Sequence, residues 1–252
     1  MKAIVARLRL NSLYSIRIPF TWQSSLTYPV LPPSAVIGLI ANCIQRYKND
    51  KHPTEYLEMI EEKIVWAGSR LLSPCIIKSF ITSAIVKWED EIGGKFTNAL
   101  GRQFAYTKEI EIAAIFKDDT IINDVEFSLK YSPFTCGDSE SISSLESIEI
   151  KNAEKVNMEE IDTFYPIPFN KDTQILSGKG QIFFMHERCK KTEEDFPLFS
   201  YLVPLTQKNK VLYPELIRVK VMKNTNEVFL IGDRTFVIKR VQTSKQNTVR
   251  KK

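Results

Sequence analysis

The alternation of hydrophobic and polar positions predicts that the chain begins and ends in β-strands. In segment 3–10, apolar residues alternate with Arg7 and Arg9, which is the period of a strand with one buried face. The same period recurs over 217–221, and Gly232-Asp233 separates two apolar runs as a hairpin turn would. Short apolar segments punctuated by proline fill the chain from residue 164 onward, so we expect a β-rich C-terminal part.

A helix is predicted where the first strand and its following loop end. Two prolines precede Ser34, a candidate N-cap, and apolar residues then recur at helical spacing from Ala35 to Tyr47. Ser34, Gly38 and Ala41 form a second face of small side chains. Gly38 costs about 1 kcal/mol of helix propensity, so we expect that this face lies close on a sheet.

The middle of the chain predicts two more helices and a long hairpin. Helical periodicity covers 54–66 and 121–131, whereas 75–88 is rich in β-branched residues and 104–116 alternates strictly. The polar, glycine-containing segment 89–101 between these two strands is the expected tip of the hairpin.

The order of these elements predicts an α+β fold. With a further strand near 147–151, the order is β-α-β-β-α-β plus one short helix, the ferredoxin-like pattern that RNA-recognition (RRM-like) folds share. We therefore expect an RRM-like domain over 1–152 that includes a β-hairpin at about 85–110, and a β-rich C-terminal part over 153–252 that ends in a basic tail.

Composition excludes several classes of protein. The 252 residues are 43% hydrophobic, as in ordinary globular proteins. Four widely spaced cysteines without a CxxC pair, and only two histidines, argue against a zinc site or a disulfide framework. We expect four free core thiols, no metal, no cofactor and no membrane segment, in a soluble cytoplasmic protein. The cysteines are Cys43, Cys75, Cys136 and Cys189.

Positive charge is concentrated at the C-terminus. The net charge of +5 is modest, but from Arg234 onward the chain has seven basic residues and no acidic one. Such a tail suits a phosphate backbone, and equally a solvated tail that aids solubility. The seven are Arg234, Lys239, Arg240, Lys245, Arg250, Lys251 and Lys252.

Three stretches in one order carry a family resemblance. They are YPVLPPSAVIGLI, GRQFAYTKEIEIAAIF and YSPFTCGDSESIS, within roughly the first 150 residues. Together they resemble the subunit-five family of CRISPR-associated (Cas) proteins, in the RAMP superfamily. Members of that family show a proline-proline-serine helix start, an arginine-x-phenylalanine strand start and a glycine-aspartate-serine turn. The lean C-terminal part, without an obvious catalytic group, is most similar to the type I-A Cascade form.

The resemblance implies a non-catalytic subunit of the type I CRISPR surveillance complex, Cascade, in antiviral defence. Such a ribonucleoprotein subunit binds the guide RNA (crRNA) and caps its repeat-derived 5′ handle. The hairpin would act as a thumb that reaches the backbone subunit, and the protein would also contact the large subunit.

The candidate RNA-binding residues of the hairpin are basic. Arg102 matches the arginine of the family's arginine-x-phenylalanine element, and it would clamp a phosphate or stack on a base. The alternative is a surface arginine paired with Glu109 or Glu111. Lys87, Lys95 and Lys108 interleave with Trp88 and Phe96, a mixture that single-stranded nucleic acid uses. The aromatic pair could instead staple the hairpin to the core, and the acidic run 89–91 could face a protein.

The remaining RNA-binding candidates lie at the ends of the predicted elements. Ser34 at the start of the first helix would lie beside a phosphate or only cap the helix. Gly137, Asp138 and Ser139 match the family's turn, although such a trio is often only a turn. Arg17 and Arg46 flank the first loop and the end of the first helix, and Arg46 could instead complement the helix dipole.

Enzymatic alternatives have weaker support. The acidic clusters lack metal-ligand spacing, and no Walker motif is present. Some relatives of type I-C cut repeat RNA without metal, and Tyr47 with Lys51 and His52 offers groups for a metal-independent endoribonuclease. Because these residues belong to a polar linker, we favour a solvent-facing role. A protein-only interaction module is a third possibility.

Overall fold

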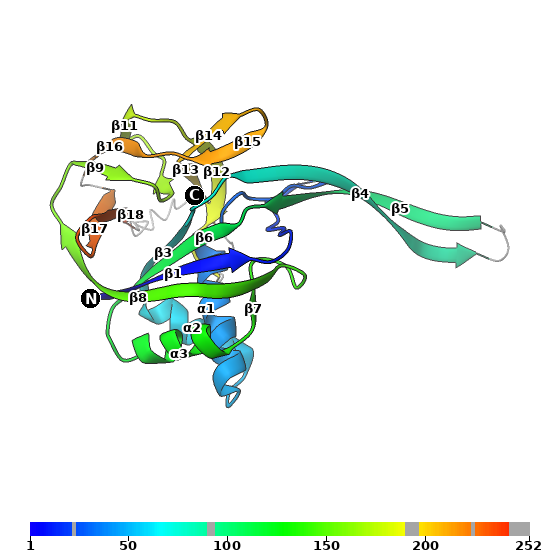
Figure 1. Ribbon diagram of the computed structural model, residues 1–252, viewed down its shortest axis with the longest axis horizontal. Helices are drawn as coiled ribbons and strands as arrows, with labels where there is room; N and C mark the ends of the chain where they lie inside the picture. The colour runs from blue at the N-terminus through cyan, green and yellow to red at the C-terminus, as the bar shows by residue number, and fades with distance from the viewer. Residues whose placement is uncertain (22–23, 90–93, 190–196, 223–224, 242–252) are drawn as a thin grey trace, which may run out of the picture.

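A seven-stranded antiparallel sheet forms the centre of the protein (Figure 1). The computed structural model describes residues 1–21, 24–89, 94–189, 197–222 and 225–241, and only the backbone of 82–100. The strands follow the order β18-β17-β8-β1-β6-β3, and β7 pairs with β8. Their bounds are β1 (Lys2–Leu10), β3 (Ile64–Leu71), β6 (Glu109–Phe116), β7 (Phe134–Thr135), β8 (Ile142–Val156), β17 (Asn226–Ile231) and β18 (Thr235–Arg240).

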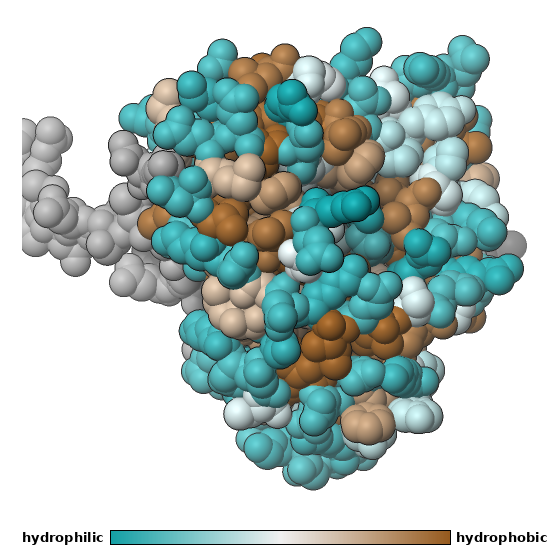
Figure 2. All heavy atoms as spheres, turned by 60° about the vertical axis from the view of Figure 1, so that its left-hand side comes forward, coloured by the Kyte–Doolittle hydropathy of each residue, from teal (hydrophilic) through white to brown (hydrophobic). Residues whose placement is uncertain are grey.

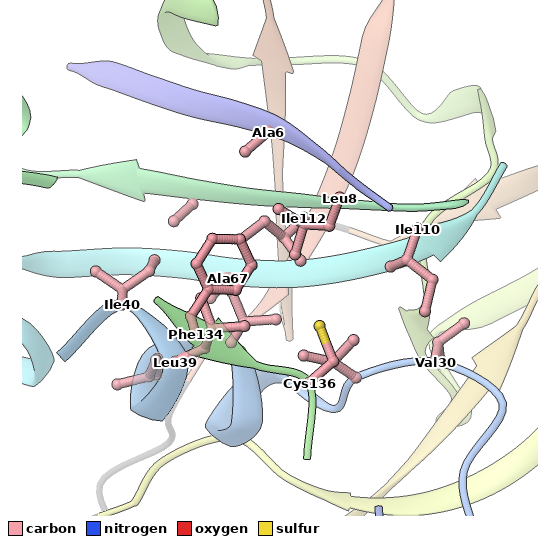
Figure 3. Close-up of a cluster of buried hydrophobic side chains, with 14 of the residues drawn as sticks. Ala6, Leu8, Val30, Leu39, Ile40, Ala67, Ile110, Ile112, Phe134 and Cys136 are labelled. Carbon is pink, nitrogen blue, oxygen red and sulfur yellow. The ribbon is translucent and has the colours of Figure 1, made fainter. Parts of the chain in front are cut away.

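Three helices cover one side of this sheet, below it in Figure 1: α1 (Pro33–Lys48), α2 (Pro53–Lys63) and α3 (Ile122–Tyr131). Apolar side chains of β1 and β6, among them Leu8 and Ile112, face those of α1, such as Leu39 and Ile40 (Figure 3). This layer is the main core, and it confirms a strand-rich α+β protein.

The sequence prediction assigned the second strand of this sheet wrongly. Residues 64–66 were expected to end a helix, but they begin β3, because α2 stops at Lys63. Trp66 is buried on the face opposite α1, where its ring meets Tyr165 edge-to-face at 5.4 Å. The long hairpin is therefore not part of the central sheet. It is an insertion between β3 and β6.

The hairpin consists of β4 (Cys75–Glu89) and β5 (Gly94–Tyr106), and it projects far from the body of the protein (Figure 1). It starts earlier than the expected residue 85 and ends before 110. The expected single strand over 104–116 is wrong, because β5 ends at Tyr106 and a separate strand, β6, begins at Glu109. There the Ser73 hydroxyl accepts hydrogen bonds from the backbone N–H groups of Lys108 and Glu109, each at 3.0 Å. The polar segment 94–101 is a strand because it pairs along β4.

Strands make up all regular structure of the described C-terminal part, as expected. The alternation at 217–221 is confirmed, because Ile217, Val219 and Val221 are buried. Two sheets have three strands each, β10-β13-β12 and β11-β16-β9, and β14 and β15 join the hairpin and β2 in a sheet of order β14-β15-β4-β5-β2. The bounds are β2 (Ser24–Ser25), β9 (Glu160–Thr163), β10 (Ile167–Pro168), β11 (Thr173–Ser177), β12 (Gln181–His186), β13 (Leu198–Val203), β14 (Leu205–Lys208), β15 (Val211–Pro214) and β16 (Ile217–Val221).

The start of α1 differs from the prediction in two ways. The N-cap is Pro32, which has no side-chain cap, and Ser34 lies at the second helical position. Pro33 takes the first position because its fixed φ suits a helix and its missing N–H would have no partner there. A Cβ added at Gly38 would meet nothing within 4 Å. The expected close approach of the small-residue face to a sheet is therefore wrong at Gly38.

The cysteine side chains lie mostly in the interior of the described chain. All four cysteines are free; Cys43, Cys75 and Cys136 are buried as expected of core thiols, whereas Cys189 is half-buried. No helix of the described residues is long and apolar enough to cross a membrane. On the side that lies left in Figure 1, hydrophilic residues surround separate hydrophobic patches (Figure 2).

Candidate nucleic-acid interface

Arg102 and Asp138 form an ion pair at the base of the hairpin. Arg102 lies on β5 and donates to the carboxylate of Asp138, in the turn between β7 and β8. Its guanidinium also lies 4.6 Å from the ring centroid of Phe104. The arginine-x-phenylalanine element and the glycine-aspartate-serine turn are therefore in contact. The carboxylate partner of Arg102 is thus Asp138, and not Glu109 or Glu111, the alternative partners that the sequence offered.

A glycine fixes this turn against the first loop. Gly137 has φ of +101°, and an added Cβ would lie 2.6 Å from the Ile16 side chain and 2.9 Å from the Ser15 carbonyl oxygen. Such contacts require glycine. Asp138 also accepts a hydrogen bond from the Ser141 hydroxyl. These contacts fix the conformation of the turn. Ser139, the next residue of the turn, is exposed to solvent.

The first loop carries Arg17 next to the same base. Tyr14 bridges Ala105 of β5 through two backbone hydrogen bonds, and Arg17 pairs with Thr27. The exposed Arg17 guanidinium donates to the Thr21 carbonyl at 3.3 Å. The loop thus follows the edge of β5 and holds its arginine in solvent.

A cavity of about 300 Å³ brings Arg17 and Ser34 together at the start of α1. Arg188, which also lines it, donates to the carbonyls of Glu61 and Ile64 at 3.0 and 3.2 Å. Two arginines line this cavity, and the Glu61 carboxylate lies beside it, where it accepts a hydrogen bond from the Cys189 backbone N–H. Its lining is Ile16, Arg17, Pro19, Tyr28, Pro32, Ser34, Ala35, His186, Arg188 and Cys189.

Arg46 is not brought to this cavity. It lies twelve residues after Ser34 on α1, which corresponds to about 18 Å along the helix. Its guanidinium donates to the Pro133 carbonyl at 2.8 Å. Its position in the last turn of α1 suits the helix dipole.

The three lysine candidates have different surroundings. Lys108 follows β5, is exposed, and lies 3.5 Å from a carboxylate oxygen of Glu109. Lys87 and Lys95 lie near the far end of β4 and β5, opposite Phe96 and Trp88 in the backbone register. The side chains of these four hairpin residues are outside the described part of the structure.

Sequence reasoning missed three residues on the face that Arg102 occupies. Phe80 is directly opposite Arg102 on β4, and Lys78 is opposite Phe104. Tyr106 follows on β5, and it is half-exposed like Phe80. The rings of Phe80 and Phe104 meet edge-to-face at 5.8 Å. Alternation of aromatic and basic residues within β4 was the signal that could have found them.

Among the groups proposed for metal-independent cleavage, His52 has structural partners. The His52 side chain accepts a hydrogen bond from the Thr54 backbone N–H, and the Glu55 carboxylate accepts one from the His52 backbone N–H at 3.2 Å. His52 therefore caps α2 in a capping box. Among the described residues, no group of three His, Cys, Asp or Glu side chains could hold a metal ion.

The basic C-terminal residues are partly engaged within the protein. Arg240 makes a bidentate ion pair with Glu187, with both N–O distances 2.9 Å. Lys239 lies 3.7 Å from Glu227. Both cations therefore have a carboxylate partner within the protein, and Arg240 is the more buried of the two. Arg234 is described and exposed, whereas Lys245, Arg250, Lys251 and Lys252 belong to residues 242–252, outside the described part.

Comparison with solved structures finds CRISPR proteins. The chain superposes on a CRISPR protein from Archaeoglobus fulgidus with a TM-score of 0.64 and 16% identity, over 96% of this chain and all of the other. This similarity shows a common fold. No known sequence family and no curated protein matches.

Two further similar chains come from CRISPR ribonucleoproteins. One belongs to the type III-B Cmr-beta complex bound to cognate target RNA and AMPPnP, with a TM-score of 0.49, 10% identity, and 86% of each chain covered. The other belongs to a CRISPR RNA-guided surveillance complex, with a TM-score of 0.45, 9% identity, and 86% of this chain and 91% of that chain covered.

Proposed function

We propose that the protein is a crRNA-binding subunit of a CRISPR effector complex. The observation that carries this proposal is the contact between Arg102 and the 137–139 turn, beside the first loop. Two sequence elements with a family resemblance, 36 residues apart, meet there on one exposed surface. The fold shared with the Archaeoglobus CRISPR protein supports the same role.

The finer proposal is a subunit-five-like protein that caps the 5′ handle in a Cascade of type I. The order β8-β1-β6-β3, with α1 and α3 as crossovers, supports the ferredoxin-like core expected of this family. The projecting β4–β5 hairpin would be the thumb that reaches the backbone subunit. The large subunit would contact the same protein.

The chemistry of binding follows from the groups at the hairpin base. A guanidinium carries five N–H donors, and the Arg102 side chain remains 33% exposed beside Asp138. It can therefore donate to an RNA phosphate as well. Arg17 would add a second cation, and the exposed Ser139 of the turn would lie against the RNA backbone. No step of this scheme breaks a bond.

A metal-independent endoribonuclease is the second candidate function. It would use Tyr47, Lys51 and His52. Tyr47 is exposed at the end of α1, close in sequence to the other two. The role of His52 as the cap of α2 favours the non-catalytic proposal, because the capping box accounts for this side chain without chemistry.

RNA retention in the assembled complex tests the proposal. The tagged protein would be expressed with its neighbouring subunits and a CRISPR array, and crRNA would be quantified after washes of increasing salt. Arg102→Gln should lower crRNA retention at least tenfold. It should also reduce the slope of log binding constant against log salt concentration by about one, because one phosphate contact is lost. Arg218→Gln is the matched control, since Arg218 is also exposed and paired with a carboxylate, Asp162. Equal effects of both variants would contradict the proposal.

A further inference from the structure

The outer face of the β14-β15-β4-β5 sheet carries three exposed aromatic rings. Directly opposite residues of paired strands share a face. The register places Val211 opposite Ile76, and Ile76 opposite Tyr106. Tyr213, two residues along β15, and Phe80, four residues along β4, therefore point to the same side as Tyr106.

These rings are open to solvent. Tyr106 is 50% exposed, Phe80 49% and Tyr213 38%. The opposite face of the same strands is the buried one, because Cys75, Ala105 and Leu212 lie in the core. The face is thus a surface, and its rings are not needed to close the core beneath it.

Positive charge accompanies the rings. Lys78 lies opposite Phe104 on this face, and Lys208 lies opposite Val211 at the edge strand β14. Both lysines are exposed, and neither has a carboxylate partner within the described residues. None of the described strand residues on this face is acidic. They are Thr206 and Lys208, Val211 and Tyr213, Ile76, Lys78 and Phe80, and Arg102, Phe104 and Tyr106.

From this arrangement we infer that the outer face of the sheet, from Tyr213 across Tyr106 to Phe80, is a stacking platform for single-stranded RNA. Rings offer π-faces to successive bases, and the lysines attract the phosphates that follow the rim. Residues two apart on a strand are about 6.8 Å apart. Tyr106 therefore lies one such row beyond Tyr213, and Phe80 lies two rows beyond Tyr106, directly opposite Arg102. The inference rests on the proposed function, because it assigns a second surface to the same RNA.

A short RNA without defined sequence tests the platform directly. The full-length protein would be titrated against a fluorescein-labelled RNA of ten uridines, and binding followed by fluorescence anisotropy. Tyr106→Ala and Tyr213→Ala should each weaken binding about tenfold, and Tyr106→Phe should retain it because the ring remains. Tyr131→Ala removes a still more exposed ring, on α3, and it should leave binding unchanged.

The possible failures are separable. Unchanged decamer binding by both alanine variants would overturn the inference. A second result would also overturn it: the alanine variants bind the decamer normally, but their complexes lose a neighbouring protein subunit. The face would then contact protein and not RNA. If the alanine variants lose the decamer while Arg102→Gln retains crRNA, the platform stands and the proposed function fails. The reverse result refutes the platform alone.

Discussion

The Arg102 guanidinium, on the second strand of the hairpin, donates to the Asp138 carboxylate, in a turn 36 residues further along the chain. The ion pair joins the inserted hairpin to the central sheet at the edge of β8. It also neutralises one of the few cations at this surface. An RNA phosphate that approaches Arg102 therefore meets a carboxylate nearby.

The first prediction concerns this carboxylate. Asp138→Asn keeps an oxygen that can accept from Ser141, and it removes the negative charge beside Arg102. We expect tighter binding of crRNA at low salt, by about fivefold, because like-charge repulsion is lost. Filter binding at two salt concentrations measures this effect. Weaker binding, as in Arg102→Gln, would show that Asp138 orients the arginine, contrary to our expectation.

The second prediction concerns helix stability. Gly38→Ala adds a methyl group into open space on α1, so the gain in helix propensity is not offset by a clash. We expect the free energy of unfolding to rise by about 1 kcal/mol. Urea denaturation followed by circular dichroism measures it. A loss of stability would instead support the close approach of this helix face to a sheet, which the sequence predicted.

The third prediction concerns a buried polar cluster on the sheet face opposite α1. Glu111 accepts from Arg70 at 2.6 Å and from Tyr165 at 2.7 Å. Burial raises the pKa of Tyr165 well above its ordinary value, and the Glu111 charge adds to the shift. The phenol therefore stays a donor at neutral pH.

Removing the shared acceptor should cost more than removing one donor. Glu111→Ala leaves Arg70 and Tyr165 unpaired, and we expect a loss of about 3 kcal/mol in the free energy of unfolding. Tyr165→Phe removes one hydrogen bond and should cost about 1 kcal/mol. Equal losses in chemical denaturation would mean that Glu111 does not link the two donors.

The fourth prediction concerns the thiols. Burial raises the pKa of Cys75 and Cys136 to about 11, and that of Cys43 and Cys189 to about 12. At pH 8 the thiolate, which is the reactive form, is therefore scarce at every site. A thiol reagent should react slowly with the native protein and with four thiols after unfolding in guanidinium. One thiol that reacts at the rate of free cysteine in the native protein would contradict this.

The sequence predicted the elements whose signal is local. Periodicity located α1 and α3 to within two residues, and the alternation at 217–221 matched its buried face. Periodicity failed where the secondary structure is determined by pairing with a strand that is distant in the sequence. The polar segment 94–101 resembles a turn, yet thirteen residues from Gly94 to Tyr106 form a strand because β4 lies beside them.

The candidate site shows the same limit. The arginine-x-phenylalanine element and the glycine-aspartate-serine turn could be located by motif, whereas their contact depends on the fold. Tyr213 could not be assigned to the platform, because only the pairing of β15 with β4 brings it there. Likewise, the sequence offered only the nearby Glu109 or Glu111 as a carboxylate partner of Arg102. The fold brings Asp138, 36 residues away, into that position.

The most direct measurement is the 5′ end of the RNA that co-purifies with the protein. The complex would be purified from cells that carry a CRISPR array, and the RNA ends sequenced for the wild type, Arg102→Gln, and a Tyr47→Phe, His52→Asn variant. Asparagine preserves the cap of α2, so loss of the imidazole is isolated from loss of stability. We predict one repeat-derived 5′ end, unchanged in the double variant and depleted in Arg102→Gln. Ragged or unprocessed ends in the double variant would identify a nuclease and contradict a non-catalytic cap.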